Sequence, residues 1–373
     1  MRLRNFTTML IFCSLFLVSC QHSQPSNDDT NLSTIRDTNL EERSASTSLF
    51  GKQSLLPIKL EEQSFHSVAD WKDDETIFYI TQSSEGSIIH TYHLFTGEDN
   101  VFYESDAPII KLEANEDHSL FLVHTSPTSY EAELIILDED ANETFYQKIP
   151  SFELQYTWNQ TNSNQLYVTS FSEDWSFNTM IIDLDNGTVS ENSISVPFVQ
   201  WMNEKQFSYL KWNEEEPSLS APLYIYDLNN EKETLLSENI ISHHSYRDTM
   251  ITIERSEQSN NKGIYRFYDL TTTTEVAKLE TPLLSLFSEW LIPYYDYSDV
   301  GGIFYTLQAN DTGTTFDLNS FNIEKSETKT ILNEIENLPF KLSPSGEFAL
   351  YGARFEKVII IEDVEIKELV ELS

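Results

Sequence analysis

Residues 201–236 read WMNEKQFSYLKWNEEEPSLSAPLYIYDLNNEKETLL, and they contain a pattern that repeats along most of the chain. Trp201 ends one apolar strand, a polar turn follows, and residues 207–210 form a second strand. Residues 223–228 form a third strand, and the Asn229-Asn230 turn after it is a hairpin signal that leads to a weaker fourth strand. Four short strands in a unit of this length are typical of one blade of a β-propeller.

The pattern recurs with nearly constant spacing. Its strand-ending positions are 43, 44, 43, 45 and 44 residues apart, at Trp71, Ala114, Trp158, Trp201, Tyr246 and Trp290. A last copy follows at the Ser343-Pro344-Ser345-Gly346 turn, 53 residues after Trp290. The range 65–372 therefore holds seven units, or six if the stretched unit at 282–334 hides a different boundary. We expect an all-β fold, a β-propeller of four-stranded blades; the alternative is a β-sandwich with coincidental spacing.

Two expectations about packing follow from the repeat. The recurring tryptophans should be core residues between blades, with Ala114 and Tyr246 as variants, because a packing position is copied from blade to blade and a functional site rarely is. The strand at residues 55–60 should complete the last blade by pairing the N-terminal and C-terminal segments. Closing the ring in this way removes the free sheet edges at its ends.

The N-terminus has the parts of a secretory signal. Arg2 and Arg4 precede an apolar run that ends in Leu17-Val18-Ser19-Cys20. This ending resembles the lipobox of bacterial lipoproteins; the alternative is an ordinary signal peptide with a chance cysteine. The resemblance implies cleavage before Cys20, a lipid on its thiol, and a protein tethered to the outer, extracytoplasmic face of a cell membrane. We therefore expect residues 1–19 to be a lipoprotein signal peptide.

The segment that follows is polar. Residues 20–54 are rich in Ser, Asn, Asp, Thr, Gln and Glu, which predicts the acylated cysteine followed by a disordered linker. Residues 55–373 should then be the propeller. Because Cys13 and Cys20 are the two cysteines of the chain, this propeller has no disulfide and no cysteine for metal binding or nucleophilic chemistry.

The charge of the chain restricts its partners. The formal net charge is −38, and without residues 1–19 the 21 basic and 61 acidic residues give −40. Such a field repels nucleic acid and anionic lipid, so neither is expected as a general partner. The membrane is expected as a partner through the lipid on Cys20 alone.

The sequence has none of the familiar catalytic signatures. It lacks the Gly-Lys-Ser/Thr phosphate loop, the Gly-x-Ser-x-Gly elbow and the His-Glu-x-x-His zinc helix, so we expect no cofactor and assign no catalytic residue. Acidic groups occur in predicted turns, where Asp is favoured for backbone reasons. They lack the spacing of a calcium loop, so no metal site is assigned. These groups are 138–140, Asp183 with Asp185, and Asp296 with Asp299.

Irregular loops provide the candidate binding residues. The connections between the second and third strands of a blade are long and differ from unit to unit, and they carry aromatic side chains beside charges. Such loops commonly form binding surfaces. The alternative is that the aromatic residues cap gaps between blades. The candidate binding rim consists of Tyr130, Trp175, Phe177, Trp212, Arg255 and Arg354.

A family resemblance rests on these features together. The lipobox, the acidic linker and the tryptophan-ended repeats resemble the YqgU-like propeller lipoproteins of Bacillus relatives. The Ser343-Pro344-Ser345-Gly346 turn is also similar to the turn of TolB-like and WD-type propellers. The resemblance implies a surface lipoprotein with a propeller usually described as six-bladed, against the seven units counted here. It implies no particular activity.

Two functions remain open at this point. One is a binding or assembly module in the cell envelope, with an envelope protein or a glycan as its partner. The other is an envelope glycan hydrolase or lyase that uses carboxylates in the propeller funnel. A fold of this kind hosts both. Carboxylates that converge in a funnel pocket would favour the enzyme, and a broad aromatic rim would favour the binding module.

Overall fold

A computed structural model describes residues 54–373, with gaps at 192–193, 195, 214–217, 260, 287–288 and 311–312. The predicted signal peptide, Cys20 and nearly all of the predicted linker therefore lie outside the described residues. The described chain consists of strands and turns without a helix, as the β-rich repeat predicts. Accordingly, no helix long and apolar enough to cross a membrane occurs in this part of the chain.

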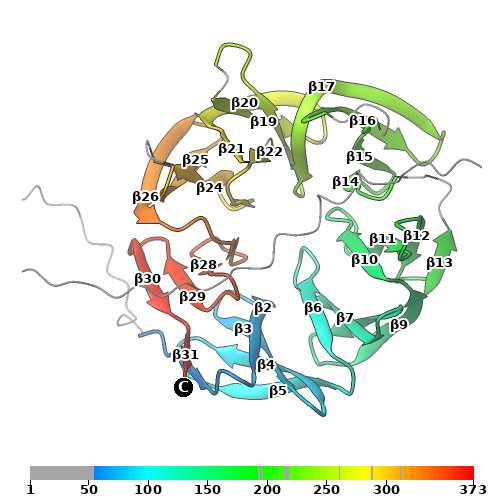
Figure 1. Ribbon diagram of the computed structural model, residues 1–373, viewed down its shortest axis with the longest axis vertical. Helices are drawn as coiled ribbons and strands as arrows, with labels where there is room; N and C mark the ends of the chain where they lie inside the picture. The colour runs from blue at the N-terminus through cyan, green and yellow to red at the C-terminus, as the bar shows by residue number, and fades with distance from the viewer. Residues whose placement is uncertain are drawn as a thin grey trace, which may run out of the picture. The chain divides into compact units, whose positions relative to one another are not determined.

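The strands of residues 65–191 form three consecutive antiparallel sheets of four strands. The strands of each sheet follow one another in chain order from the centre outward (Figure 1). The first sheet contains β2 (Phe65–Trp71), β3 (Thr76–Ser83), β4 (Gly86–His93) and β5 (Asp99–Ser105). The second contains β6 (Ile109–Ala114), β7 (Leu120–Thr128), β8 (Glu131–Asp138) and β9 (Glu143–Pro150). The third contains β10 (Glu153–Trp158), β11 (Gln165–Phe171), β12 (Phe177–Asp183) and β13 (Thr188–Glu191).

The next two blades are joined through one long strand. A seven-stranded sheet holds β14 (Gln200–Asn203), β15 (Gln206–Leu210), β16 (Ala221–Asp227), β17 (Lys232–Ser245), β18 (Thr249–Arg255), β19 (Lys262–Asp269) and β20 (Thr274–Pro282). The first half of β17 pairs with β16 as the outer strand of one blade, and residues 240–245 pair with β18 as the inner strand of the next. Asn239 lies between the two halves with a φ of 63°, in the left-handed region that Asn tolerates better than most residues.

The last two blades complete the ring. One contains β23 (Tyr295–Ser298), β24 (Ile303–Ala309), β25 (Phe316–Asn322) and β26 (Glu327–Ile335), and the other β27 (Phe340–Leu342), β28 (Phe348–Tyr351), β29 (Lys357–Ile360) and β30 (Glu365–Glu368). With β17 counted in both of its blades, the described sheets form seven four-stranded units around a centre, the number of units counted in the sequence (Figure 1).

The ring closes differently from the expectation. β1 (Ile58–Leu60) pairs in parallel with β31 (Val370–Leu372), so the N-terminal and C-terminal segments do meet. However, the last blade already has four strands of its own, and β1 and β31 form a separate two-stranded sheet. The prediction that residues 55–60 complete the last blade is therefore wrong. Ile58 and Val370 are buried in the cluster that joins the first and last blades.

The repeated tryptophans are core residues, as predicted. Trp71, Trp158 and Trp201 are buried at equivalent positions on inner strands. The Trp71 indole donates a hydrogen bond of 3.0 Å to the Lys341 carbonyl of the preceding blade, and the Trp201 indole makes the same kind of bond, 3.3 Å long, to the Thr157 carbonyl. Trp71 and Trp201 thus link neighbouring blades through hydrogen bonds, and the buried Trp158 contributes by packing.

Two of the strand-ending positions predicted from the sequence, Tyr246 and Trp290, are wrong. Trp71 lies opposite Ile77 in the sheet register, and the residue in the corresponding place of the fifth blade is Ser245, opposite Met250, not Tyr246. In the sixth blade the corresponding residue is Tyr297, opposite Phe304. The sequence repeat predicted Trp290 in this place because an insertion precedes the sixth blade. In the insertion, β21 (Leu284–Leu286) and β22 (Glu289–Leu291) form an extra two-stranded sheet that contains Trp290.

Candidate functional site

Exposed aromatic residues gather on the connections of the second, third and fourth blades. Half or more of each side chain is exposed at Tyr130 (60%) and Phe198 (62%), and nearly half at Phe152, Trp175 and Trp212. Tyr130, Trp175 and Trp212 lie between second and third strands, whereas Phe152 and Phe198 lie between blades. In a propeller these two kinds of connection share one face, so the five residues belong to the same face of the ring.

Part of this set is in direct contact around a buried ring. The Phe171 ring is buried, and its centroid lies 6.0 Å from Trp175, 5.8 Å from Phe177 and 5.7 Å from Phe198. Phe152 donates a backbone hydrogen bond of 2.8 Å to the Phe171 carbonyl. Its ring lies 6.3 Å from the Tyr130 ring. These two groups of rings, linked through the Phe152–Phe171 backbone hydrogen bond, are here called the aromatic rim: Tyr130, Phe152, Trp175, Phe177 and Phe198.

The backbone around Trp175 holds its side chain outward. Ser172 and Ser176 are linked by a hydrogen bond of 2.8 Å, and the Trp175 amide donates to the Ser172 carbonyl at 2.9 Å. Trp175 itself has a φ of 65°, a left-handed conformation that is uncommon for a bulky residue. An exposed tryptophan in a strained and hydrogen-bonded turn is a feature more often found at functional sites than elsewhere.

The structure brings together three of the predicted rim residues and separates the others. Tyr130, Trp175 and Phe177 belong to the aromatic rim, whereas Trp212 is exposed on the next blade. Arg255 is exposed at the end of β18. Arg354 lies over the Phe65 ring, 4.8 Å from its centroid, and donates a 3.5 Å hydrogen bond to the Phe65 carbonyl. Arg354 therefore takes part in joining the last blade to the first.

Phe152 and Phe198 were missed by the sequence analysis. The predicted binding loops are connections within blades, whereas these two residues lie in connections between blades. Both follow closely on a proline, Pro150 and Pro197, which marks the end of a strand or a loop. That signal would have located them, although not their contact with the buried Phe171.

The inner strands carry a second group of polar residues. Asp70 is fully buried and receives the Lys341 ammonium group at 2.6 Å. The backbone amides of Trp71 and Ala114 donate to its two oxygens at 2.8 and 2.9 Å. Lys111 and Glu113 form another ion pair on β6. Lys341 and Lys111, two lysines of the inner strands, are thus each paired with a carboxylate.

Asp296 repeats the geometry of Asp70. It lies on the inner strand of the sixth blade, and its oxygens accept hydrogen bonds from the amides of Tyr297 (2.9 Å) and Leu342 (2.8 Å). Burial raises the pKa of this carboxyl group, and the two amides oppose the effect. A pocket of about 330 Å³ adjoins Asp296. Its other lining residues are His244, Tyr246, Tyr295, Phe340, Lys341 and Phe355.

A carboxyl pair brings the second and sixth blades together. Glu116 follows β6 and Asp299 follows β23, and the two carboxyl groups are within hydrogen-bonding reach of each other. Burial, with the Asp299 charge as the next cause, raises the pKa of Glu116 to about 7. Burial also raises the pKa of Asp299. The pair can therefore share a proton near neutral pH, which is how two carboxylates coexist at short distance.

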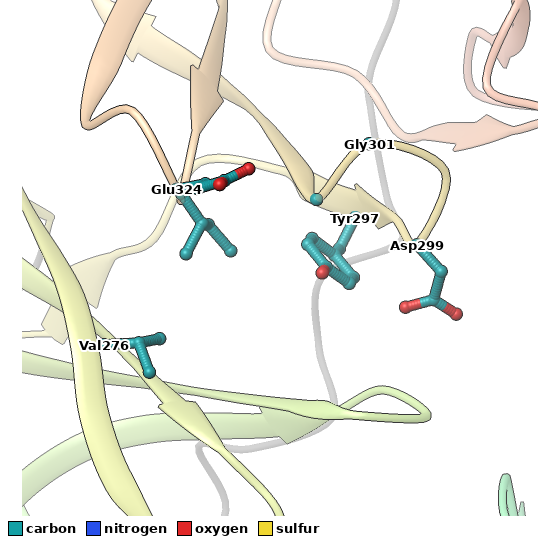
Figure 2. Close-up of a pocket in the computed structure, with 7 residues that line it drawn as sticks. Val276, Tyr297, Asp299, Gly301 and Glu324 are labelled. Carbon is teal, nitrogen blue, oxygen red and sulfur yellow. The ribbon is translucent and has the colours of Figure 1, made fainter.

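A larger, open pocket lies beside Asp299. It has a volume of about 580 Å³ and is lined by Val276, Tyr297, Asp299, Gly301, Gly302, Ile323 and Glu324. In Figure 2 the Tyr297 ring lies between Asp299 and Val276 in the view. Gly301 and Gly302 have φ values of 82° and 60°, which a turn of this kind requires.

The described residues offer little support for a metal centre. Among them, no group of three or more His, Cys, Asp or Glu side chains is arranged to hold a metal ion. Asp138, one of the turn aspartates, accepts hydrogen bonds from the amides of Asp140 and Asn142, both at 2.9 Å. Asp183 accepts a bond from the Asn186 amide in the same way. These two carboxylates are occupied by the backbone of their own turns.

Comparisons with known proteins agree with the fold. Residues 93–352 match the model of the YqgU-like 6-bladed beta propeller domain. The "Uncharacterized lipoprotein YqgU" of Bacillus subtilis (strain 168) is 27% identical over 341 residues, which cover 91% of this chain and 94% of the relative. By their description the propellers of this family have six blades, one fewer than the four-stranded units that the described sheets form.

Solved structures show the same architecture. The uncharacterized protein lmo1340 from Listeria monocytogenes EGD-e has a TM-score of 0.79 at 17% identity, over 86% of this chain and 98% of that one. An oligogalacturonate lyase solved in complex with manganese has a TM-score of 0.54 at 8% identity, over 78% of this chain and 86% of that one. At these identities the likeness concerns the fold alone.

Proposed function

Because this chain belongs to the YqgU-like family of six-bladed β-propellers, we propose that it is a lipid-anchored binding module on the outer face of a cell membrane. The anchor is the lipid on Cys20, which lies outside the described residues. Two observations support it: the sequence Leu17-Val18-Ser19-Cys20, and a relative aligned over 91% of the chain that is named a lipoprotein. Residues 20–54 then serve as the linker between the membrane and the ring.

The single observation that carries the binding function is the aromatic rim. Three of its rings, Trp175, Phe177 and Phe198, surround the buried Phe171, and Tyr130 and Phe152 add two exposed rings on the same face, where a partner can cover them. Scattered exposed apolar residues are ordinary, but a contiguous aromatic group on irregular loops is typical of a recognition surface. Aromatic rings also pack on the faces of sugar rings, so both an envelope protein and a glycan fit this surface.

Charge narrows the choice of partner. Glu131, Glu153, Glu173 and Asp174 flank the rim residues in the sequence. Hydrogen bonds from the Ser176 hydroxyl and amide lower the pKa of Asp174, so this carboxylate stays charged. A partner with basic or neutral groups around an apolar or sugar face is complementary to such a surface.

The test is capture of a partner by crosslinking in intact cells. Replacing Tyr130 and Trp175 with Ala removes two large exposed rings of the aromatic rim, and we expect partner capture to be abolished. Leu235 and Val276 are exposed to a similar extent on outer strands and provide the matched Ala double variant, which should capture normally. Intact capture by a folded Tyr130→Ala, Trp175→Ala protein would refute the proposal that the aromatic rim binds the partner. The attached molecule, protein or glycan, identifies the partner class.

A glycan hydrolase or lyase is the second candidate, and the Glu116–Asp299 pair is the observation in its favour. Glycosidases place their two carboxyl groups roughly 5 Å or more apart, and carboxyl groups within hydrogen-bonding reach are closer than that. The short distance between the two carboxyl groups is therefore typical of a pair that shares a proton, and it is too short for a glycosidase centre. Release of sugar from envelope glycan by the wild-type protein, lost in Glu116→Gln, would reverse this preference.

A further inference from the structure

Asp70 and Asp296 occupy the same position in two blades. Each is the residue before the strand-ending position of its inner strand, Trp71 in the first blade and Tyr297 in the sixth. Each accepts one hydrogen bond from the amide that follows it and one from an amide of the next blade. The four distances lie between 2.8 and 2.9 Å. The two carboxylates therefore have nearly identical backbone surroundings.

The two positions differ in their cation. Asp70 binds the ammonium group of Lys341, which comes from the equivalent position of the preceding blade. For Asp296 the equivalent residue of the preceding blade is His244, opposite Ile251. Among the described residues, no Lys, Arg or His nitrogen forms an ion pair with Asp296. Its side-chain partner is the neutral hydroxyl of Tyr246, which donates a hydrogen bond to it. Asp296 thus has the backbone setting of Asp70 with a neutral hydroxyl in place of an ammonium group.

A pocket lies beside Asp296, and His244, the residue at the position equivalent to Lys341, lines it. It has a volume of about 330 Å³, and five aromatic rings line it beside Asp296: His244, Tyr246, Tyr295, Phe340 and Phe355. Phe355 is held there in a left-handed conformation, with a φ of 54°. Aromatic rings attract an ammonium group through their negative faces, so a carboxylate lined by aromatic side chains is a setting that suits such a group.

The charges around the pocket favour a cation as well. Lys341 also borders the pocket, but its ammonium group is neutralised by Asp70 at 2.6 Å. Burial lowers the pKa of His244 to about 4, so its imidazole is neutral at physiological pH. The formal charge of −38 adds a long-range field that concentrates cations at the protein.

We propose that the Asp296 pocket binds an alkylammonium group, which takes at Asp296 the place that Lys341 takes at Asp70. The group can belong to a small amine or to a lysine side chain of a partner, and both present the same chemistry to the pocket. The ammonium group would contact the Asp296 carboxylate, and its alkyl chain would lie among the rings. This site is separate from the aromatic rim, and the proposal does not depend on the function of the rim.

The experiment is calorimetric titration of the full chain with two probes, cadaverine and a blocked lysine tripeptide, at about 0.15 M salt to screen general attraction. We expect saturable binding of one or both, and the probe that binds identifies the source of the group. Asp296→Asn should weaken binding about tenfold or more, as expected for loss of a charged hydrogen bond. Glu324→Gln removes the same charge from the neighbouring pocket and should change affinity less than twofold.

Two further variants keep the test valid if Asp296→Asn fails to fold. Phe355→Leu removes a ring and leaves the carboxylate and its backbone hydrogen bonds in place, so it should weaken binding severalfold. His244→Lys supplies an internal ammonium group at the position equivalent to Lys341, so it should abolish binding of the probes in a folded protein. Equal weakening by Asp296→Asn and Glu324→Gln, normal binding by His244→Lys, or no saturable binding to the wild type would each overturn the proposal.

Discussion

Glu116 and Asp299 show how single residues connect distant parts of this ring. They come from the second and sixth blades. The Asp299 charge raises the pKa of Glu116, whereas the hydrogen bond from Glu116 lowers the pKa of Asp299, which burial raises. Arg247 and Lys341 lower the pKa of Glu116, but burial and the Asp299 carboxylate outweigh them. The folded protein therefore holds a proton on this carboxyl pair at a pH at which the unfolded chain would have lost it.

This sharing makes stability depend on pH. The pKa of Glu116 is about 7 in the folded protein and near 4.5 in the unfolded chain, so the folded state binds the extra proton between these values. The contribution is fully present below about pH 4.5 and is lost as the pH rises through 7. We expect the urea midpoint to fall between pH 5 and pH 8, measured by intrinsic fluorescence.

The Glu116→Gln variant provides the comparison. It cannot lose a proton, so its midpoint should fall less over the same pH range. Glu327→Gln, at an exposed position of an outer strand, should behave like the wild type. Parallel pH profiles for the wild type and Glu116→Gln would show that the carboxyl pair makes no such contribution.

At the scale of one element, β17 serves two blades because its backbone turns at a single residue. Asn239 has a φ of 63°, with the outer half of the strand before it and the inner half after it. A β-branched residue is strained in this conformation, whereas Gly adopts it freely. We expect Asn239→Val to lower the free energy of unfolding by about 1–2 kcal/mol and Asn239→Gly to change it by less than about 0.5 kcal/mol, by urea denaturation.

A matched position checks the specificity of that effect. Leu235 is exposed on the same strand with an ordinary extended backbone, and Leu235→Val should be nearly neutral. If Asn239→Val is as stable as the wild type, the left-handed residue is not what permits the passage of β17 between blades.

The elements themselves could be predicted from the sequence where local signals repeat. Trp71, Trp158 and Trp201 mark inner strands because burial between blades selects the same residue at the same place. The prediction was wrong in the fifth blade because the small Ser245 occupies the position that tryptophan occupies in other blades. It was wrong in the sixth blade because Trp290 belongs to an inserted hairpin. Counting residues cannot distinguish an insertion from a longer period.

The candidate sites could be predicted only in part, for a similar reason. Tyr130 and Trp175 were found because exposed aromatic residues beside charges are visible in the sequence. The Asp296 pocket was not found, because its members come from three blades, and members from different blades lie 44 or more residues apart in the chain. Asp296 is recognised as a candidate because it occupies the same position in its blade as Asp70. That equivalence can be seen only from the register of the strands in the sheets.

At the scale of the whole molecule, the two-stranded sheet of β1 and β31 closes the ring. Ile58 and Val370 are 3% and 5% exposed, and they pack in the cluster shared by the first and last blades. Removing residues 370–373 deletes β31 and exposes Ile58. From the apolar area of two such side chains, we expect a loss of about 4 kcal/mol in the free energy of unfolding, measured in urea.

A substitution within the same strand controls for its charge. Glu371 is half exposed and pairs with the exposed Lys59, so Glu371→Gln should change stability by less than about 0.5 kcal/mol. A truncated protein as stable as the wild type would mean that the blades hold the ring together without β1 and β31.

The same sheet also bears on how the protein is made. The Ser373 hydroxyl donates to the Leu60 carbonyl from 313 residues away in the chain. During synthesis β1 is made before every blade, whereas its partner β31 is made after all of them. The first strand therefore waits unpaired while the ring is built, and its pairing is a late step with the largest loop to close. A nascent chain that stops short of Val370 would leave that strand exposed, which marks it for the proteases that remove unfinished proteins.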